Sequence, residues 1–137
     1  MTVVVDTGAI FALIDSSDAW HARVRAWWAS GAHDVVIPTS VLPEVCDLLQ
    51  TRIGPLAEIA FLRAVAAGEF PLEPVGAADL TRIVELVKRY ADLPLGYVDA
   101  SLVAVAERVG ARTVLTTDRR HFGVVRGRGG RALTVVP

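Results

Sequence analysis

The chain has 137 residues, of which 53% are hydrophobic and 21% are charged, and its formal net charge is −1. This length and composition predict one globular domain over residues 1–137 and argue against an intrinsically disordered chain. Every stretch of about 18 residues contains a charge, a glycine or a proline, so the sequence predicts no membrane-spanning helix.

Short β-branched runs alternate with longer helical stretches, which is typical of an α/β protein built on a mainly parallel sheet. The first apolar run predicts a strand over Thr2–Val5. One helical stretch is expected to follow over residues 9–30, ended by Gly31. Residues 34–37 predict a second strand, which ends at Pro38.

The middle of the chain predicts three helices and an irregular strand. We expect Thr39 or Ser40 to cap the first helix, with Pro43 in its first turn. Pro55 begins the next helix, which runs to about residue 68, and residues 77–90 form the third. Two prolines in residues 70–75 indicate an edge strand.

The clearest helical pattern follows Gly96, where Val98, Leu102, Val105 and Val109 recur on one face. Gly110 is expected to end this helix. Strands over Thr113–Leu115 and residues 133–136 then complete the sheet.

Four acidic residues stand where such a sheet forms a ligand crevice. Asp6 and Asp118 each follow a predicted strand, and open α/β sheets bind ligands beyond the carboxyl ends of their strands. Glu44 and Asp99 fall in the first turns of helices, where the helix dipole favours a carboxylate. The pattern therefore gives all four acids access to one crevice.

Carboxylates gathered in this way must either take up protons or be neutralised by cations. Two unit charges about 4 Å apart repel by roughly 4 kcal/mol at an effective dielectric constant of 20. Divalent ions with oxygen ligands neutralise such a cluster, so we expect Mg²⁺, with Mn²⁺ as a substitute. Zinc fits less well, because Cys46 is the only cysteine and the three histidines show no ligand spacing.

A site of metal ions and carboxylates suits phosphodiester hydrolysis, in which the ion activates water and stabilises charge on the phosphate. The residues from Arg119 to Arg131 include five arginines and no acid. The first two, Arg119 and Arg120, directly follow Asp118 and are candidates for contacts with RNA phosphates. A solvated loop is the other interpretation of this segment.

Four fragments occur in an order that resembles the PIN-domain ribonucleases, and most closely the VapC toxins of toxin–antitoxin pairs. The fragments are VVVDTGAI (residues 3–10), PEV (43–45), GYVDASLVAVAER (96–108) and LTTDRRHF (115–122). The resemblance covers essentially the whole chain. It implies a three-layer PIN-like fold, in which helices flank a central, mainly parallel, twisted sheet of about five strands.

The same resemblance implies the roles of individual residues and the partners. Asp6, Glu44, Asp99 and Asp118 would be the catalytic, metal-binding acids of an endoribonuclease, and Thr116 would support them by hydrogen bonding. Gly8 departs from the family, which commonly has a small hydroxyl residue there, so Thr7 is the remaining hydroxyl candidate after the first strand. The resemblance further implies an RNA substrate, a homodimer and a small antitoxin.

Other functions remain as alternatives. A non-catalytic module that binds RNA or protein would keep the fold, and a structure-specific DNA nuclease would keep the metal chemistry. A nucleotide cofactor is not expected, because no glycine-rich turn links a strand to a helix. The single cysteine and the start without a basic leader indicate a cytoplasmic protein.

Several residues have a structural interpretation beside a functional one. Asp92 precedes Leu93 and Pro94, which favours a turn over a place near the metal. Cys46 lies among apolar residues and is expected to be buried, not nucleophilic. His121 is left open between a phosphate contact and a surface position. The three tryptophans are expected in the core or at an interface, and they are Trp20, Trp27 and Trp28.

Overall fold

The computed structural model describes residues 1–31, 33–127 and 129–137. They form a five-stranded sheet in the order β3-β2-β1-β4-β5, in which every strand pair is parallel. The strands are β1 (Thr2–Val5), β2 (Asp34–Pro38), β3 (Leu72–Glu73), β4 (Thr113–Leu115) and β5 (Thr134–Val136). The expected parallel sheet is therefore confirmed, with the proline-flanked β3 at one edge.

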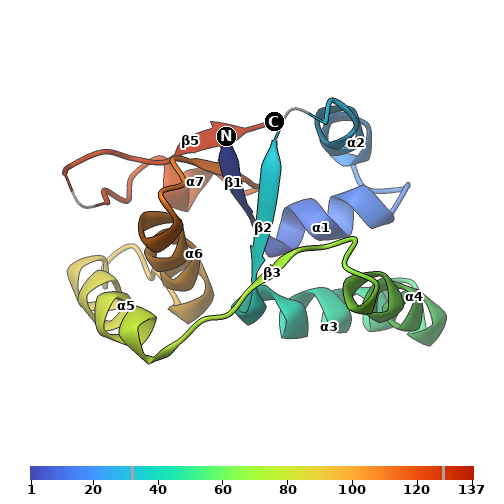
Figure 1. Ribbon diagram of the computed structural model, residues 1–137, viewed down its shortest axis with the longest axis horizontal. Coiled ribbons are helices and arrows are strands. Elements are labelled where there is room, and N and C mark those ends of the chain that lie inside the picture. Colours follow the sequence, from blue (N-terminus) through green and yellow to red (C-terminus); the bar gives the residue numbers. More distant parts are fainter. Residues whose placement is uncertain (32, 128) are drawn as a thin grey trace.

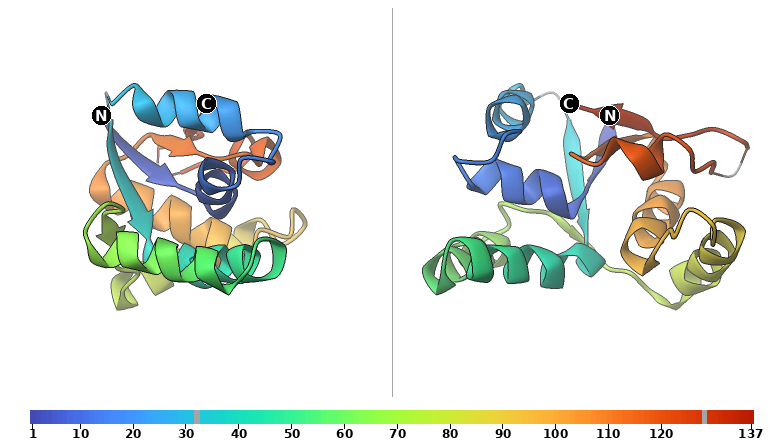
Figure 2. Two further views of the ribbon diagram at one scale, coloured as in Figure 1. Left: turned by 90° about the vertical axis from the view of Figure 1, so that its right-hand side faces the viewer. Right: turned by 180° about the vertical axis from the view of Figure 1, so that it is seen from behind.

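Helices occupy both sides of the strands. They are α1 (Thr7–Ile14), α2 (His21–Ala29), α3 (Leu42–Arg52), α4 (Pro55–Ala66), α5 (Ala77–Arg89), α6 (Tyr97–Val109) and α7 (Arg119–Phe122), with a 3₁₀ turn over Thr39–Val41. Figure 1 shows α1 to α4 to the right of β1 and β2, and α5 and α6 to the left. The views in Figure 2 show the strands between these two groups of helices.

The order of the strands reverses beside β1, where the sequence predicted a ligand crevice. From β1 the chain moves to β2 and β3 on one side, and later to β4 and β5 on the other. Such a reversal beside the first strand leaves a gap between the carboxyl ends of β1 and β4, where ligands bind in open α/β sheets. The paired ends of these strands are Val5 and Leu115. The residues that follow them are therefore brought to one place.

The core is built on β1 and α6. All of Val3, Val4 and Val5 are buried, as expected for a central parallel strand with both faces covered. Every residue from Ala100 to Ala106 is buried as well. The sequence predicted one buried face for α6, but in this stretch all sides of the helix are buried. Because α6 contacts both the sheet and α5, small residues cover the sides that a surface helix would expose to water.

The continuous helix expected over residues 9–30 is wrong, since the chain forms α1 and α2 with a turn between them. In that turn Asp15 accepts hydrogen bonds from both the backbone N–H and the hydroxyl of Ser17, at 3.0 and 2.7 Å. Asp18 likewise accepts from the backbone N–H of Trp20 at 2.8 Å. These short side chains compete with the helical hydrogen bonds of the backbone and end α1.

The expected cap at Thr39 or Ser40 is also wrong. Thr39 accepts a hydrogen bond from the backbone N–H of Val75 at 3.1 Å, and the Ser40 hydroxyl lies 2.5 Å from the hydroxyl of Ser101. Both side chains are therefore used in tertiary contacts, and α3 begins without a side-chain cap. The short helix α7 was not expected from the sequence.

Candidate active site

Asp6 is the residue that joins β1 to α1. It adopts the extended conformation of an N-cap, and its Oδ1 accepts a 2.7 Å hydrogen bond from the backbone N–H of Thr7. Its Oδ2 accepts a second bond, of 2.8 Å, from the hydroxyl of Thr116. The side chain is almost fully buried. The structure thus fixes both oxygens of this carboxylate beside the ends of β1 and β4.

Glu44 comes to the same place from the first turn of α3. The hydroxyl of Thr7 donates a 3.0 Å hydrogen bond to its Oε1. Because the backbone N–H of Thr7 already donates to Asp6, Thr7 connects these two acids. This contact agrees with a supporting role for Thr7.

Asp118 lies just beyond β4 and caps the short helix α7. Its Oδ1 accepts a 3.0 Å hydrogen bond from the backbone N–H of Arg120. Its own backbone N–H donates to the Thr116 hydroxyl at 3.0 Å. Since Thr116 donates in turn to Asp6, this threonine connects a second pair of acids.

Asp99 projects from the first turn of α6 and contacts His121. Oδ2 of Asp99 lies 3.0 Å from Nδ1 of His121, and the same nitrogen lies 3.6 Å from Oδ2 of Asp118. His121 therefore links a third pair of acids. The contacts form one chain through the site, which runs Glu44, Thr7, Asp6, Thr116, Asp118, His121 and Asp99.

The pKa values of Asp6 and Asp99 are raised by burial and by the charges of the neighbouring acids. Burial raises the pKa of Asp6 from 3.8 to about 6, the Thr116 and Thr7 hydrogen bonds oppose this, and the charges of Asp99 and Glu44 raise it further. Burial also raises the pKa of Asp99; the charge of His121 opposes this, and repulsion by Asp118 and Glu44 adds to it. The four expected acids thus act on one another electrostatically.

The donor set fits a hard divalent ion. All four acids offer oxygen ligands, and among the described residues neither Oδ1 of Asp99 nor Oε2 of Glu44 accepts a hydrogen bond. Within the described part of the chain, no group of three or more His, Cys, Asp or Glu side chains lies close enough together to hold a metal ion. Mg²⁺ does not require such a group, because it usually keeps several waters and binds through one or two carboxylates.

The arginines that follow Asp118 differ in their surroundings. The Arg120 side chain is 87% exposed, and its Nε lies 3.6 Å from Oδ1 of Asp118. Arg119 instead donates to the carbonyl of Pro137 and lies over the ring of Trp20 at 5.5 Å. Arg120 is therefore the freer of the two. Arg128, which belongs to the same basic segment of the sequence, lies outside the described residues.

The residues left open by the sequence have other surroundings. Asp92 is exposed in the turn before α6, and Cys46, expected to be buried, is half-buried and packs against the core. The three tryptophans also pack against the core. Sequence reasoning missed the contact of His121 with both acids, although its place three residues after Asp118 in a short helix is the spacing that brings side chains together.

The side chain of Thr117 lies close to the backbone at Gly8. A Cβ atom at Gly8 would lie 2.4 Å from Oγ1 of Thr117, which is inside van der Waals contact. The Thr117 hydroxyl therefore occupies the space of a side chain at position 8. This relation between the first turn of α1 and the end of β4 has no signal in the local sequence.

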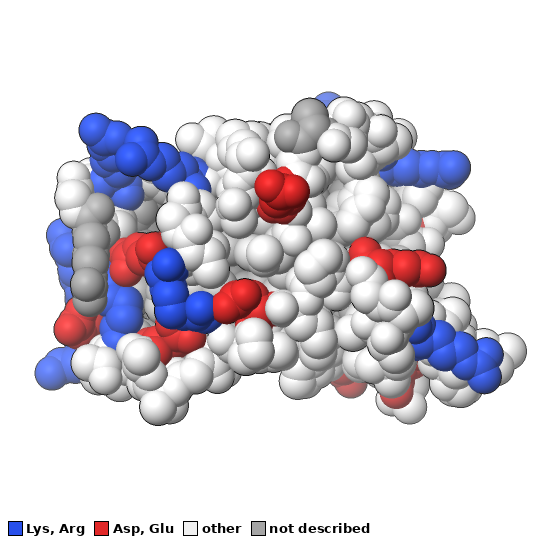
Figure 3. Space-filling model, in the orientation of Figure 1, with Lys and Arg blue, Asp and Glu red and all other residues white. Residues whose placement is uncertain are grey.

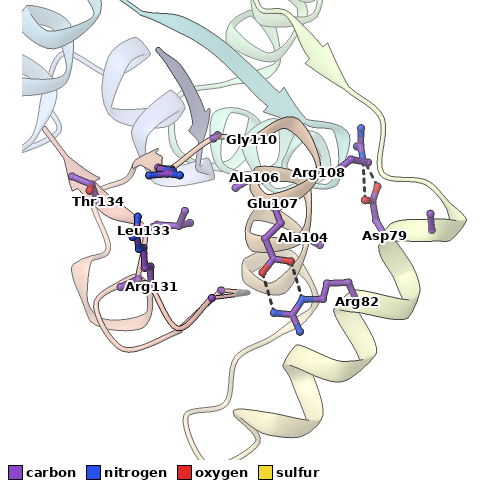
Figure 4. Close-up of a pocket in the computed structure, with 16 residues that line it drawn as sticks. Asp79, Arg82, Ala104, Ala106, Glu107, Arg108, Gly110, Arg131, Leu133 and Thr134 are labelled. Carbon is purple, nitrogen blue, oxygen red and sulfur yellow. Dashed lines mark hydrogen bonds and ion pairs between the residues drawn. The ribbon is translucent and has the colours of Figure 1, made fainter.

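A hollow lies away from the acids. It has a volume of about 960 Å³ and includes Gly110, Arg112 and Thr134 at the amino ends of β4 and β5 (Figure 4). Two charged pairs line it, Arg82 with Glu107 at 2.8 Å and Arg108 with Asp79 at 2.9 Å.

Positive and negative side chains are interleaved on this side of the molecule (Figure 3). In the lining of the hollow, Arg82 and Arg108 are each paired with an acid, so opposite charges neutralise each other there. We therefore place the candidate active site at the acids.

Comparison with known proteins decides the family. The model of the PIN domain matches residues 3–127. The chain belongs to the PIN-domain family. Ribonuclease VapC26 of Mycobacterium tuberculosis is 38% identical to this PIN-domain chain over 135 residues, which are 98% of the chain and 100% of the relative. The expected fold and family are confirmed.

Solved structures of VapC proteins are similar as well. The crystal structure of Mycobacterium tuberculosis VapC20, described as a Sarcin-Ricin loop cleaving toxin, has a TM-score of 0.80 at 28% identity and covers 86% of this chain and 91% of its own. A toxin-antitoxin complex from Klebsiella pneumoniae has a TM-score of 0.65 at 19% identity, with coverage of 98% and 96%, and shows the shared fold. Within the described residues, no helix is long and apolar enough to cross a membrane.

Proposed function

We propose that this PIN-domain chain is a Mg²⁺-dependent endoribonuclease and the toxin of a toxin–antitoxin pair. Its near-full-length similarity to a protein named a ribonuclease supports the cleavage of RNA. The acids at the carboxyl ends of the strands support a hydrolytic mechanism that needs no covalent nucleophile.

The observation that carries the proposal is the shortage of positive charge at the acids. Among the described residues, no lysine or arginine forms an ion pair with Asp6, Glu44 or Asp99. The pKa values of Asp6 and Asp99 are both raised, because burial and repulsion by the other acids disfavour ionised carboxylates. A divalent cation would relieve this repulsion.

We assign the metal-binding, catalytic role to Asp6, Glu44, Asp99 and Asp118. A bound Mg²⁺ or Mn²⁺ ion would supply an activated water and would stabilise charge on the phosphate. Thr116 and Thr7 hold the carboxylates of Asp6 and Glu44 in place through their hydroxyls. Arg120, with its exposed guanidinium, and Arg119 beside it would orient the RNA through its phosphates.

The test is cleavage of RNA by the purified protein. We expect cleavage of an RNA pool in Mg²⁺ or Mn²⁺, none in EDTA, and none of DNA of matched sequence. Because VapC20, 28% identical, is named a 23S rRNA-specific endonuclease, ribosomal RNA is the first defined substrate to try. Binding of RNA without cleavage in any metal would instead support the non-catalytic module, and cleavage of DNA alone would support the DNA nuclease.

The partners follow from the same proposal. We propose a homodimer in the cytoplasm that a small antitoxin inhibits, and the fold shared with a toxin-antitoxin complex supports the antitoxin as a partner. Expression of the chain alone should slow bacterial growth, and expression of its antitoxin should restore it. Growth at the normal rate while the active nuclease accumulates would contradict the toxin role.

A further inference from the structure

His121 lies in α7 and turns its imidazole toward two of the acids. Its Nδ1 is 3.0 Å from Oδ2 of Asp99 and 3.6 Å from Oδ2 of Asp118. The side chain is 22% exposed, and the nitrogen itself is buried. A buried polar nitrogen without a hydrogen-bond partner needs an explanation, and the proposed roles of the four acids do not give one.

The nitrogen is placed between the two carboxylates instead of being paired with one. It is not aligned with either oxygen as a directed hydrogen bond requires. Its position brings the imidazole within 3.0 Å of one carboxylate oxygen and 3.6 Å of the other, where an N–H group reduces the repulsion between the two acids electrostatically. Consistent with this, burial raises the pKa of Asp99, and His121 opposes that rise whereas the charge of Asp118 adds to it.

The position matters because Asp99 and Asp118 come from separate elements. Asp99 belongs to α6, whereas Asp118 lies between β4 and α7. The hydroxyls of Thr7 and Thr116 connect the other acids, and among the described residues neither of them bonds to Asp99. His121 is therefore the contact that ties Asp99 to the rest of the site.

We propose that His121 is a positioning residue that sets the spacing of Asp99 and Asp118 for the divalent ion. The inference rests on the proposed function and adds a residue to it. His121 contacts Oδ2 of Asp99 and leaves Oδ1 free of hydrogen bonds from described residues. Outer residues that orient the ligands of a metal contribute about 10- to 100-fold to its affinity.

The experiment measures Mn²⁺ binding at one fixed pH, by electron paramagnetic resonance of the free ion. The proteins are the full-length wild type, His121→Ala and His121→Asn, because the amide nitrogen of asparagine can occupy the place of Nδ1. We expect His121→Ala to weaken Mn²⁺ binding by about tenfold or more. His121→Asn should recover most of that loss. The kcat for RNA should follow the same order, whereas KM should change little.

His21→Ala is the matched control, since Nδ1 of His21 lies 2.7 Å from the carbonyl oxygen of Ala12 and contacts none of the four acids. It should bind Mn²⁺ as the wild type does. Thermal unfolding in EDTA checks that each variant is folded before metal is added.

Wild-type Mn²⁺ affinity and kcat in His121→Ala would overturn the inference and leave the proposed function intact. A folded His121→Asn as weak as His121→Ala would also overturn it, because the donor would then be irrelevant. A wild type that neither binds Mn²⁺ nor cleaves RNA would overturn the proposed function itself, and the inference with it.

Discussion

The hydroxyl of Thr116 donates a 2.8 Å hydrogen bond to Oδ2 of Asp6, a residue 110 positions earlier in the chain. This bond lowers the pKa of a carboxyl group that burial raises to about 6. Thr116→Val keeps the shape and removes the donor, so the pKa of Asp6 should rise further. The acid side of the pH–rate profile should shift to higher pH, and stability should fall by about 1 kcal/mol. An unshifted profile would show that this bond does not control Asp6.

Asp99→Asn removes one charge from the cluster without changing its shape. We expect RNA cleavage to fall at least about 100-fold, because the variant loses an anionic ligand for the metal. Circular dichroism and the unfolding temperature should stay close to the wild type. Cleavage at the wild-type rate would exclude Asp99 from the site. Asp92→Asn is the matched control, since Asp92 is exposed in the turn before α6.

Because the pKa of Asp6 is raised in the folded protein, Asp6 makes the protein less stable as the pH rises. Its pKa is raised from 3.8 to about 6 on folding, so the folded protein holds this proton to higher pH than the unfolded chain. The free energy of unfolding contributed by Asp6 is therefore fully present below about pH 4 and falls as the pH rises through about 6, by roughly 3 kcal/mol.

Asp6→Asn should remove the fall in the free energy of unfolding that the ionisation of Asp6 causes as the pH rises. In EDTA at pH 7, we expect the variant to be about 1–3 kcal/mol more stable than the wild type in urea unfolding. Added Mg²⁺ should stabilise the wild type more than the variant, because only the wild type keeps the full set of charges. A variant less stable than the wild type in EDTA would contradict this account.

Gly8 and Thr117 should show coupled effects on stability. Gly8→Ser places a Cβ atom against the Thr117 hydroxyl, at 2.4 Å in the present geometry, so Thr117 must rotate or the backbone must shift. We expect a loss of about 1–3 kcal/mol in the single variant. In Gly8→Ser/Thr117→Ala the obstructing hydroxyl is absent, and most of the stability should return. Strictly additive losses in the double-mutant cycle would refute the contact.

Arg120 and Arg119 should differ in RNA binding. Arg120→Ala should weaken binding in a salt-dependent manner, with the slope of log K against log salt reduced by about 1 for each lost phosphate contact. Arg119→Ala gives the comparison, and it should also loosen the packing on Trp20. Binding should be measured with the Asp99→Asn protein, so that RNA stays intact. A slope unchanged in both variants would exclude these arginines from the RNA-binding surface.

The positions of Asp6 and Asp118 could be predicted because the signals are local. A buried β-branched run followed by a polar residue marks the end of a central strand, and the sheet order carries both ends to one crevice. The break between α1 and α2 falls on four consecutive polar residues, 15–18, a turn signal that the expected helix over residues 9–30 did not take into account. Asp15 and Asp18 ended the helix by bonding to nearby backbone groups, and periodicity does not register that competition.

By itself, the sequence determined the alternation of strands and helices and the family, and it pointed to four acids as candidates for the site, since each depends on residue types at short, fixed spacings. Only the tertiary structure decided how those acids are connected. Thr7, Thr116 and His121 act between elements that are far apart in the chain. Their contacts follow from the pairing of β1 with β4 and the burial of α6, and such relations arise only when the whole core is packed.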